Sequence, residues 1–199
     1  MRATTGLAAG LAVLTVGLAV TACGTAAQPD RATSTIGSAS PSGASSPGRN
    51  PAGCRTASLT WTLVLLPKET GTRRDARLTI ANKAPETCLF AGYPGFSVHN
   101  GKANSLEGVG HGHPGSFTLR RGTGVTVDLH YAPRGAKGAG DYCVAENEAL
   151  VSAPHNPDRD RVNIPVVETH HRAAEIDACG DSISMSPPRY TAAPASATR

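Results

Sequence analysis

The chain has 199 residues, an aromatic content of 4% and a formal net charge of +4. Over residues 54–187 Lys and Arg equal Asp and Glu in number, so the excess positive charge lies in the flanking segments. Because nucleic-acid-binding domains carry a basic patch or stripe, this balance excludes nucleic acid as a partner.

Residues 1–22 have the pattern of a bacterial lipoprotein signal peptide. Arg2 precedes an uninterrupted run of small and apolar residues, 6–20, which is too short and too rich in Gly and Ala for a membrane span. The run ends in Val20-Thr21-Ala22-Cys23, an apolar residue and two small residues before a Cys. We therefore expect lipid attachment at Cys23 and localisation at the extracytoplasmic face of the cell membrane. The alternative is an ordinary secretory signal with an unmodified Cys23.

Residues 23–53 are interpreted as the lipidated Cys and a flexible linker, and residues 188–199 as a disordered tail. Ile36 is the only large apolar residue between positions 24 and 53, and the rest is mostly Ser, Thr, Ala, Gly and Pro. Such a segment cannot bury enough apolar surface to offset the entropy of ordering. These boundaries leave residues 54–187 as one folded domain.

Within that domain the hydrophobic residues recur with the period of two that is typical of β-strands. The clearest case is 125–131, where four apolar residues alternate with Thr126, Asp128 and His130. Similar patterns and short apolar runs predict further strands at residues 59–65, 78–81, 96–98, 117–120, 150–151, 162–166 and 183–185. Residues 144–151 are the only candidate helix. Seven or eight short strands separated by Gly- and Pro-rich turns predict an all-β sandwich or barrel.

Two segments carry turn signals. Asn100-Gly101 is a strong short hairpin signal, because both residue types tolerate positive φ. In Gly92-Tyr93-Pro94-Gly95, Pro94 fixes φ and Gly95 permits a positive φ, which predicts a type II turn. We expect Tyr93 to cover one end of the domain.

The chain contains five cysteines. If Cys23 carries the lipid, Cys54, Cys88, Cys143 and Cys179 remain. An even set in an exported chain predicts two disulfides with three possible connectivities, and we favour Cys54–Cys88 and Cys143–Cys179, which join sequence neighbours. A zinc site is the competing interpretation, but no two of these cysteines lie within a few residues of each other.

A set of motifs in fixed order resembles domain-of-unknown-function family 4232, which occurs in exported proteins and lipoproteins of GC-rich Gram-positive bacteria. The motifs are Cys54-Arg55, Leu78-Thr79-Ile80-Ala81-Asn82, Thr87-Cys88-Leu89, Gly92-Tyr93-Pro94-Gly95-Phe96, Asn100-Gly101, the strand 125–131 and the two later cysteines. The resemblance covers about residues 54–187. It implies an immunoglobulin-like β-sandwich of about seven to eight strands, and it implies no activity.

Seven histidines suggest a metal site as an alternative. His111 and His113 are separated by one Gly, and a His-x-His loop can chelate one ion. Neighbouring residues on a strand point to opposite faces, so the adjacent His170 and His171 cannot both do so from regular structure. A site at His111 and His113 needs further ligands, such as His99 or His130, and we expect no cofactor.

A hydrolase is not indicated by the sequence. There is no Gly-x-Ser-x-Gly motif. The expected disulfides remove a Cys nucleophile. Glu146 and Glu148 could share one strand face as paired carboxylates, but a solvated rim is the simpler interpretation.

We therefore expect no enzyme but a membrane-anchored extracytoplasmic lipoprotein that acts as a binding or structural module at the cell envelope. Its partners would be the membrane, through the lipid, and an envelope protein, a glycan or a wall polymer. The alternative is a metal- or small-solute-binding lipoprotein that uses the loop of His111 and His113.

Overall fold

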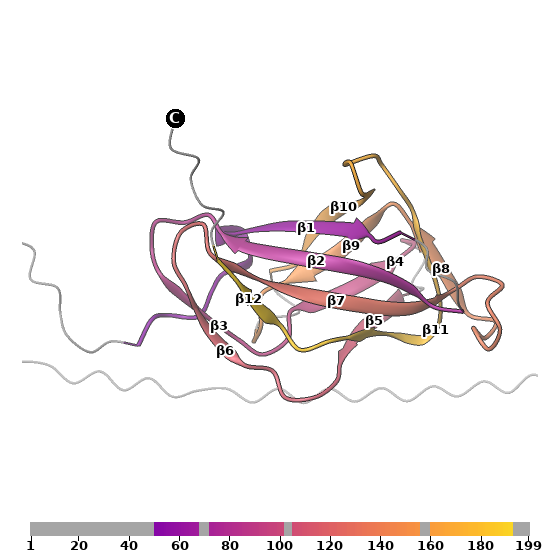
Figure 1. Ribbon diagram of the computed structural model, residues 1–199, viewed down its shortest axis with the longest axis horizontal. Helices are drawn as coiled ribbons and strands as arrows, with labels where there is room; N and C mark the ends of the chain where they lie inside the picture. The colour runs from indigo at the N-terminus through magenta and orange to yellow at the C-terminus, as the bar shows by residue number, and fades with distance from the viewer. Residues whose placement is uncertain (1–49, 68–71, 102–104, 156–159, 193–199) are drawn as a thin grey trace, which may run out of the picture. The chain divides into compact units, whose positions relative to one another are not determined.

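The computed structural model describes residues 50–67, 72–101, 105–155 and 160–192. The predicted signal peptide 1–22, Cys23 and the predicted linker up to residue 49 lie outside these residues. Within the described residues the only helical element is a short 3-10 turn, Thr56–Ser58 (η1), and the rest is strands and loops (Figure 1). The predicted all-β class is confirmed.

The described part of the chain forms twelve strands. Their bounds are Leu59–Leu65 (β1), Arg74–Asn82 (β2), Cys88–Ala91 (β3), Gly95–His99 (β4), Ser105–Gly110 (β5), Ser116–Leu119 (β6), Gly124–Pro133 (β7), Cys143–Glu146 (β8), Glu148–Ser152 (β9), Val162–Glu168 (β10), Ile176–Met185 (β11) and Arg189–Thr191 (β12).

The largest sheet closes on itself. Its strands are hydrogen-bonded in the order β12-β7-β2-β1-β10-β9-β4-β5-β11-β8, and β7 also pairs with β11. The strands from β7 to β11 therefore form a closed barrel of eight strands, to which β12 and β8 are added, while β3 and β6 form a separate two-stranded sheet. An immunoglobulin-like sandwich packs two separate sheets face to face. Here the eight barrel strands are hydrogen-bonded in one continuous ring instead.

The core lies inside the ring and is formed by alternate residues of each strand. In β2 and β7, Leu78 lies opposite Val127 and Ile80 lies opposite Val125, and all four side chains are fully buried. Their outward neighbours are polar or charged, so the alternation in the sequence is the in-and-out alternation of the strands. Figure 1 shows β1, β2 and β7 running side by side.

The candidate helix 144–151 is wrong. The segment forms β8 and β9, which contact different neighbours: Val144 lies opposite Ala178 of β11, and Val151 lies opposite Val162 of β10. Val144 and Val151 are both fully buried. Pairing with two separate strands thus outweighs the weak helical pattern of this short segment.

The domain extends beyond both predicted boundaries. In the predicted linker, Gly53 forms a β-bridge with Leu89, and the carbonyl oxygen of Ala52 accepts a hydrogen bond from the amide of Leu89. In the predicted tail, β12 pairs with the first residues of β7. Leu89 and the edge of β7 supply backbone hydrogen-bond partners for these flanking residues, and composition alone does not reveal such partners.

The two predicted turns differ in outcome. β4 and β5 form an antiparallel pair around Asn100 and Gly101, as the hairpin signal predicts, and Gly101 has φ 64°. The predicted type II turn at Gly95 is wrong. Gly95 begins β4, and Gly92 is the residue with positive φ, at 102°.

Candidate functional site

Both favoured disulfides are confirmed and lie toward opposite ends of β7. Cys54 is bonded to Cys88 of β3, and Cys88 lies opposite Leu119, the last residue of β6. From Leu119 the chain turns into the first residues of β7. Cys143 is bonded to Cys179, which lies opposite Ala132 near the last residue of β7. Each end of the domain is therefore held by one covalent link.

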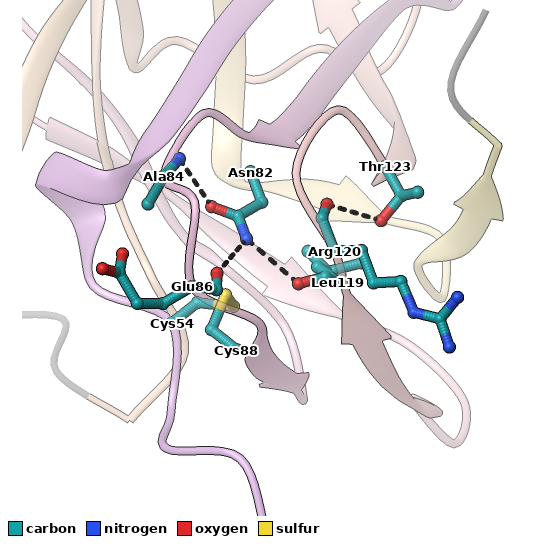
Figure 2. Close-up of a disulfide and its surroundings, with 8 residues drawn as sticks. All are labelled: Cys54, Asn82, Ala84, Glu86, Cys88, Leu119, Arg120 and Thr123. Carbon is teal, nitrogen blue, oxygen red and sulfur yellow. Dashed lines mark hydrogen bonds between the residues drawn. A yellow bond between two sulfur atoms is a disulfide. The ribbon is translucent and has the colours of Figure 1, made fainter. Parts of the chain in front are cut away.

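Asn82, at the end of β2, joins two turns beside the first disulfide (Figure 2). Its side-chain amide donates hydrogen bonds to the carbonyl oxygens of Glu86, at 2.8 Å, and Leu119, at 3.0 Å. Its side-chain oxygen accepts a hydrogen bond from the amide of Ala84 at 2.9 Å. Asn82 is 1% exposed, so all its side-chain groups are used for structure and none is available to a ligand.

A hollow of about 430 Å³ opens next to this network. Its polar lining comes from the side chains of Arg55, Ser58, Glu86 and Thr87. Because the side chain of Asn82 is fully hydrogen-bonded within the fold, the other polar side chains here belong to loop residues and to Ser58 of the short turn η1, and none of them lies on a strand.

The histidines of the metal alternative are exposed. His111 and His113 both lie on the surface, and the carbonyl oxygen of His111 accepts a hydrogen bond from the Tyr93 hydroxyl at 2.5 Å. Among the residues that the structure describes, no three His, Cys, Asp or Glu side chains are grouped as metal ligands. The geometry therefore adds no support to a metal site at this loop.

The structure brings together a Ser, a His and an Asp that the sequence analysis did not connect. The Nδ1 atom of His130 lies 2.7 Å from an oxygen of Asp75, and its Nε2 atom lies 3.1 Å from the Ser186 hydroxyl. Asp75 and His130 are opposite each other in β2 and β7, and Ser186 follows β11. This is the hydrogen-bond order of a nucleophile, a base and an orienting carboxylate.

The backbone at Ser186 and at the two residues that follow has no free N–H for this chemistry. Acyl transfer requires N–H donors at the position where the oxyanion develops. The backbone amide of Ser186 already donates to the carbonyl oxygen of Asp128 at 2.9 Å, and the next two residues, Pro187 and Pro188, have no N–H. The geometry supports a structural role for this group, in which His130 links three neighbouring segments of the barrel surface.

An ion cluster lies next to it on the same outward face. Asp128 accepts hydrogen bonds from Arg77, at 2.8 Å, and from Arg189 of β12. Burial by itself would raise the pKa of Asp128, but the hydrogen bonds and charges of the two guanidinium groups outweigh burial and lower it below 3.8. The cluster ties β12 to the barrel.

A polar hollow of about 300 Å³ lies elsewhere, on the outer face of β4, β5 and β9. It is lined by Ser97, His99, Ser105, Glu107, Leu150 and Arg161. Ser97 lies opposite both Glu107 and Leu150, so these three side chains form one row across the sheet. Unlike the hollow beside Asn82, this one takes most of its lining from regular strands.

His99 and His130 stand out in the sequence only as possible metal ligands, and the sequence does not reveal the Ser186 group or the polar hollow as sites. Asp75, His130 and Ser186 are separated by more than fifty residues along the chain, and only the strand pairing brings them together. The outward positions of β4 and β5 did carry a signal, since polar side chains at His99, Ser105 and Glu107 alternate with apolar ones.

The described ranges contain no helix with the length and hydrophobicity needed to cross a membrane. Comparison with curated proteins and with solved structures gives no match. A family model does match: the one described as domain of unknown function (DUF4232), over residues 54–188. The match spans most of the chain and includes both disulfides and the strands that build the barrel, and the chain therefore belongs to the DUF4232 family.

Proposed function

We propose that the protein is a lipoprotein held by Cys23 at the extracytoplasmic face of the cell membrane, and that its barrel is a non-catalytic binding or structural module of the cell envelope. The partners of such a module are the membrane, through the lipid, and an envelope protein, a glycan or a wall polymer.

The two disulfides support the compartment. Disulfides persist in oxidising environments and are rare where glutathione keeps thiols reduced. Cys54–Cys88 and Cys143–Cys179 use all four cysteines that follow Cys23. This leaves Cys23 as the one cysteine for a lipid, in agreement with the motif around it.

The observation that carries the non-catalytic assignment is the state of Ser186. It belongs to a Ser–His–Asp arrangement within the described residues, yet its amide is bonded to Asp128 and a proline follows it. A serine with a base, but with no free N–H at its own amide or at the two residues that follow, lacks the donors that most directly stabilise acyl transfer. Binding by surface side chains needs no such donors.

The anchor is tested by mass spectrometry of the protein purified from its native membrane. We expect an N-terminal peptide that begins at Cys23 with a diacylglycerol on its sulfur. We also expect the Cys23→Ala variant to leave the membrane fraction. A wild-type protein with an unmodified Cys23 would contradict the anchor.

The non-catalytic assignment is tested by labelling with a fluorophosphonate probe, which reacts with activated serines. We expect no labelled Ser186 after prolonged incubation, and no difference between the wild type and the Ser186→Ala variant. Labelling of Ser186 that disappears in the His130→Ala variant would show an activated nucleophile and overturn the assignment.

A further inference from the structure

We infer that the polar hollow on the outer face of β4, β5 and β9 binds an uncharged, hydroxyl-rich saccharide. The inference rests on the proposed binding function and names both the site and the chemical class of the ligand. The three strands can be followed in Figure 1.

The hollow is built on strands rather than on loops. Leu150, Ser97 and Glu107 come from three adjacent strands and lie in one cross-strand row. His99 and Ser105 lie opposite each other in the next outward row. Strand pairing fixes the backbone at these five positions before a ligand arrives, which lowers the entropy that binding costs. Arg161, just before β10, is the one lining residue outside a strand.

The lining combines donors and acceptors in the way that neighbouring hydroxyl groups require. Arg161 donates to the Ser97 hydroxyl at 3.5 Å and lies 4.0 Å from a Glu107 oxygen, so a guanidinium, a hydroxyl and a carboxylate lie within reach of one ligand. The Nδ1 atom of His99 accepts from the amide of Gly101 at 3.4 Å, so the neutral ring carries its proton on Nε2. A carboxylate, a guanidinium, an imidazole and two hydroxyls thus surround a space of about 300 Å³.

An exposed tyrosine reaches the edge of the hollow. The hydroxyl of Tyr142 donates to the carbonyl oxygen of Ser105, a lining residue, at 3.3 Å, and Tyr142 is 43% exposed. The face of an aromatic ring packs well against the C–H face of a sugar, and Tyr keeps a polar end in water. Leu150 supplies a second apolar contact within the hollow.

The charges favour an uncharged ligand over an anionic polymer. Glu107 and Arg161 carry opposite charges within the hollow and oppose each other's field. A site for a polyanion would need an excess of cations, because binding depends on complementary potentials. The hollow has one guanidinium and one carboxylate, and this balance suits hydroxyl groups better than phosphates.

The probe is an array of immobilised neutral oligosaccharides built from hexoses and N-acetylhexosamines, screened with the full-length, disulfide-bonded protein. We expect binding to at least one of them. A titration followed by NMR with that oligosaccharide should shift the backbone signals of β4 and β5, including Ser97 and Glu107, and leave those of β12 unchanged.

Three substitutions test the residues. Glu107→Ala and Arg161→Ala should each weaken binding about tenfold or more, since each removes hydrogen bonds that involve a charged group. Tyr142→Phe should retain binding because the ring remains, whereas Tyr142→Ala should weaken it. Matched controls are Glu175→Ala and Arg120→Ala, which remove an exposed acid and an exposed base outside the hollow and should leave binding unchanged. The NMR spectra of all variants show whether the fold persists.

Two results would overturn the inference. The first is no binding and no shift in β4 or β5 at millimolar oligosaccharide. The second is binding that the Glu107 and Arg161 variants leave intact, or that occurs only with anionic polymers and disappears in salt. Suppose that either result is obtained while Cys23 is lipidated and Ser186 stays unlabelled in the same preparation. The saccharide site is then wrong, but the proposed function is not contradicted.

Discussion

The ring of Tyr93 occupies the space that a side chain at position 110 would need, so Gly110 is the residue that allows this aromatic group to lie against β5. A Cβ atom added at Gly110 would overlap the ring, and the Tyr93 hydroxyl is fixed by its hydrogen bond to the carbonyl oxygen of His111. Tyr93 is partly buried and also packs against the hydrophobic core.

We expect Gly110→Ala to lower the free energy of unfolding by about 1–3 kcal/mol, because the ring must move out of a well-packed position. Urea denaturation measures the change. In a Tyr93→Ala background the same substitution should cost much less, since the overlapping ring is gone. Gly53→Ala is the control, because a Cβ atom there meets nothing within 4 Å. Additive effects of the two substitutions would contradict the packing of Tyr93 on Gly110.

Asn82→Ala should be among the more destabilising polar substitutions. It leaves the carbonyl oxygens of Glu86 and Leu119 and the amide of Ala84 without their partner. A buried group left unsatisfied costs about 1–3 kcal/mol, so we expect a loss of about 3 kcal/mol, measured by urea denaturation. The exposed Asn163→Ala serves as control and should change stability by less than about 0.5 kcal/mol. Equal effects of the two substitutions would show that Asn82 does not join the turns.

The two disulfides should stabilise the domain almost equally. The bonded cysteines are 34 and 36 residues apart, and in the chain-entropy model each closed loop contributes about 4 kcal/mol. Paired Cys→Ala variants that lack one disulfide, compared by calorimetry, should therefore lose similar amounts. Wild-type protein treated with a reducing agent should lose more than either variant. A large inequality between the variants would mean that the entropy of the unfolded chain is not the main source of stability.

The Asp128 cluster predicts a pH-dependent contribution to stability. The two guanidinium groups lower the pKa of Asp128 in the folded state, so the stabilisation is complete above the pKa of the unfolded chain and is lost as the pH falls through the folded value. At pH 7 we expect Asp128→Asn to cost about 1 kcal/mol, because Arg77 and Arg189 are largely exposed. The cost should shrink steadily when urea denaturation is repeated below about pH 4. A cost that stays constant down to pH 2 would contradict the ion cluster.

The local pattern was sufficient to predict several elements. The strand predicted at 59–65 matches β1, and the alternation over 125–131 lies within β7. Both strands have one buried face and one polar or solvent-facing side, which is the condition under which a period of two appears in a sequence. The cysteine pairs were also predictable, since an exported chain with four remaining cysteines has few connectivities.

Features that depend on distant partners were not predictable. The barrel closes because β7 pairs with β11 across an irregular register between Cys179 and Ser184, and no local pattern signals this. β12 is short, its three residues are all exposed, and only its pairing with β7 marks it as a strand. The hydrogen bonds that join His130 to Asp75 and Ser186 likewise arise from strands that meet only in the folded chain.

The closed ring has a consequence for crowding. Molecules held at a membrane by a lipid meet copies of themselves in two dimensions, at an effective concentration far above that of a freely diffusing protein. Long unpaired strand edges would then template pairing between neighbours and lead to aggregation. Beyond the ring, the described sheet ends in β12 and β8, which have 3 and 4 residues. Under the proposed anchoring at Cys23, such short edges would let many copies stand close together on one surface without polymerising.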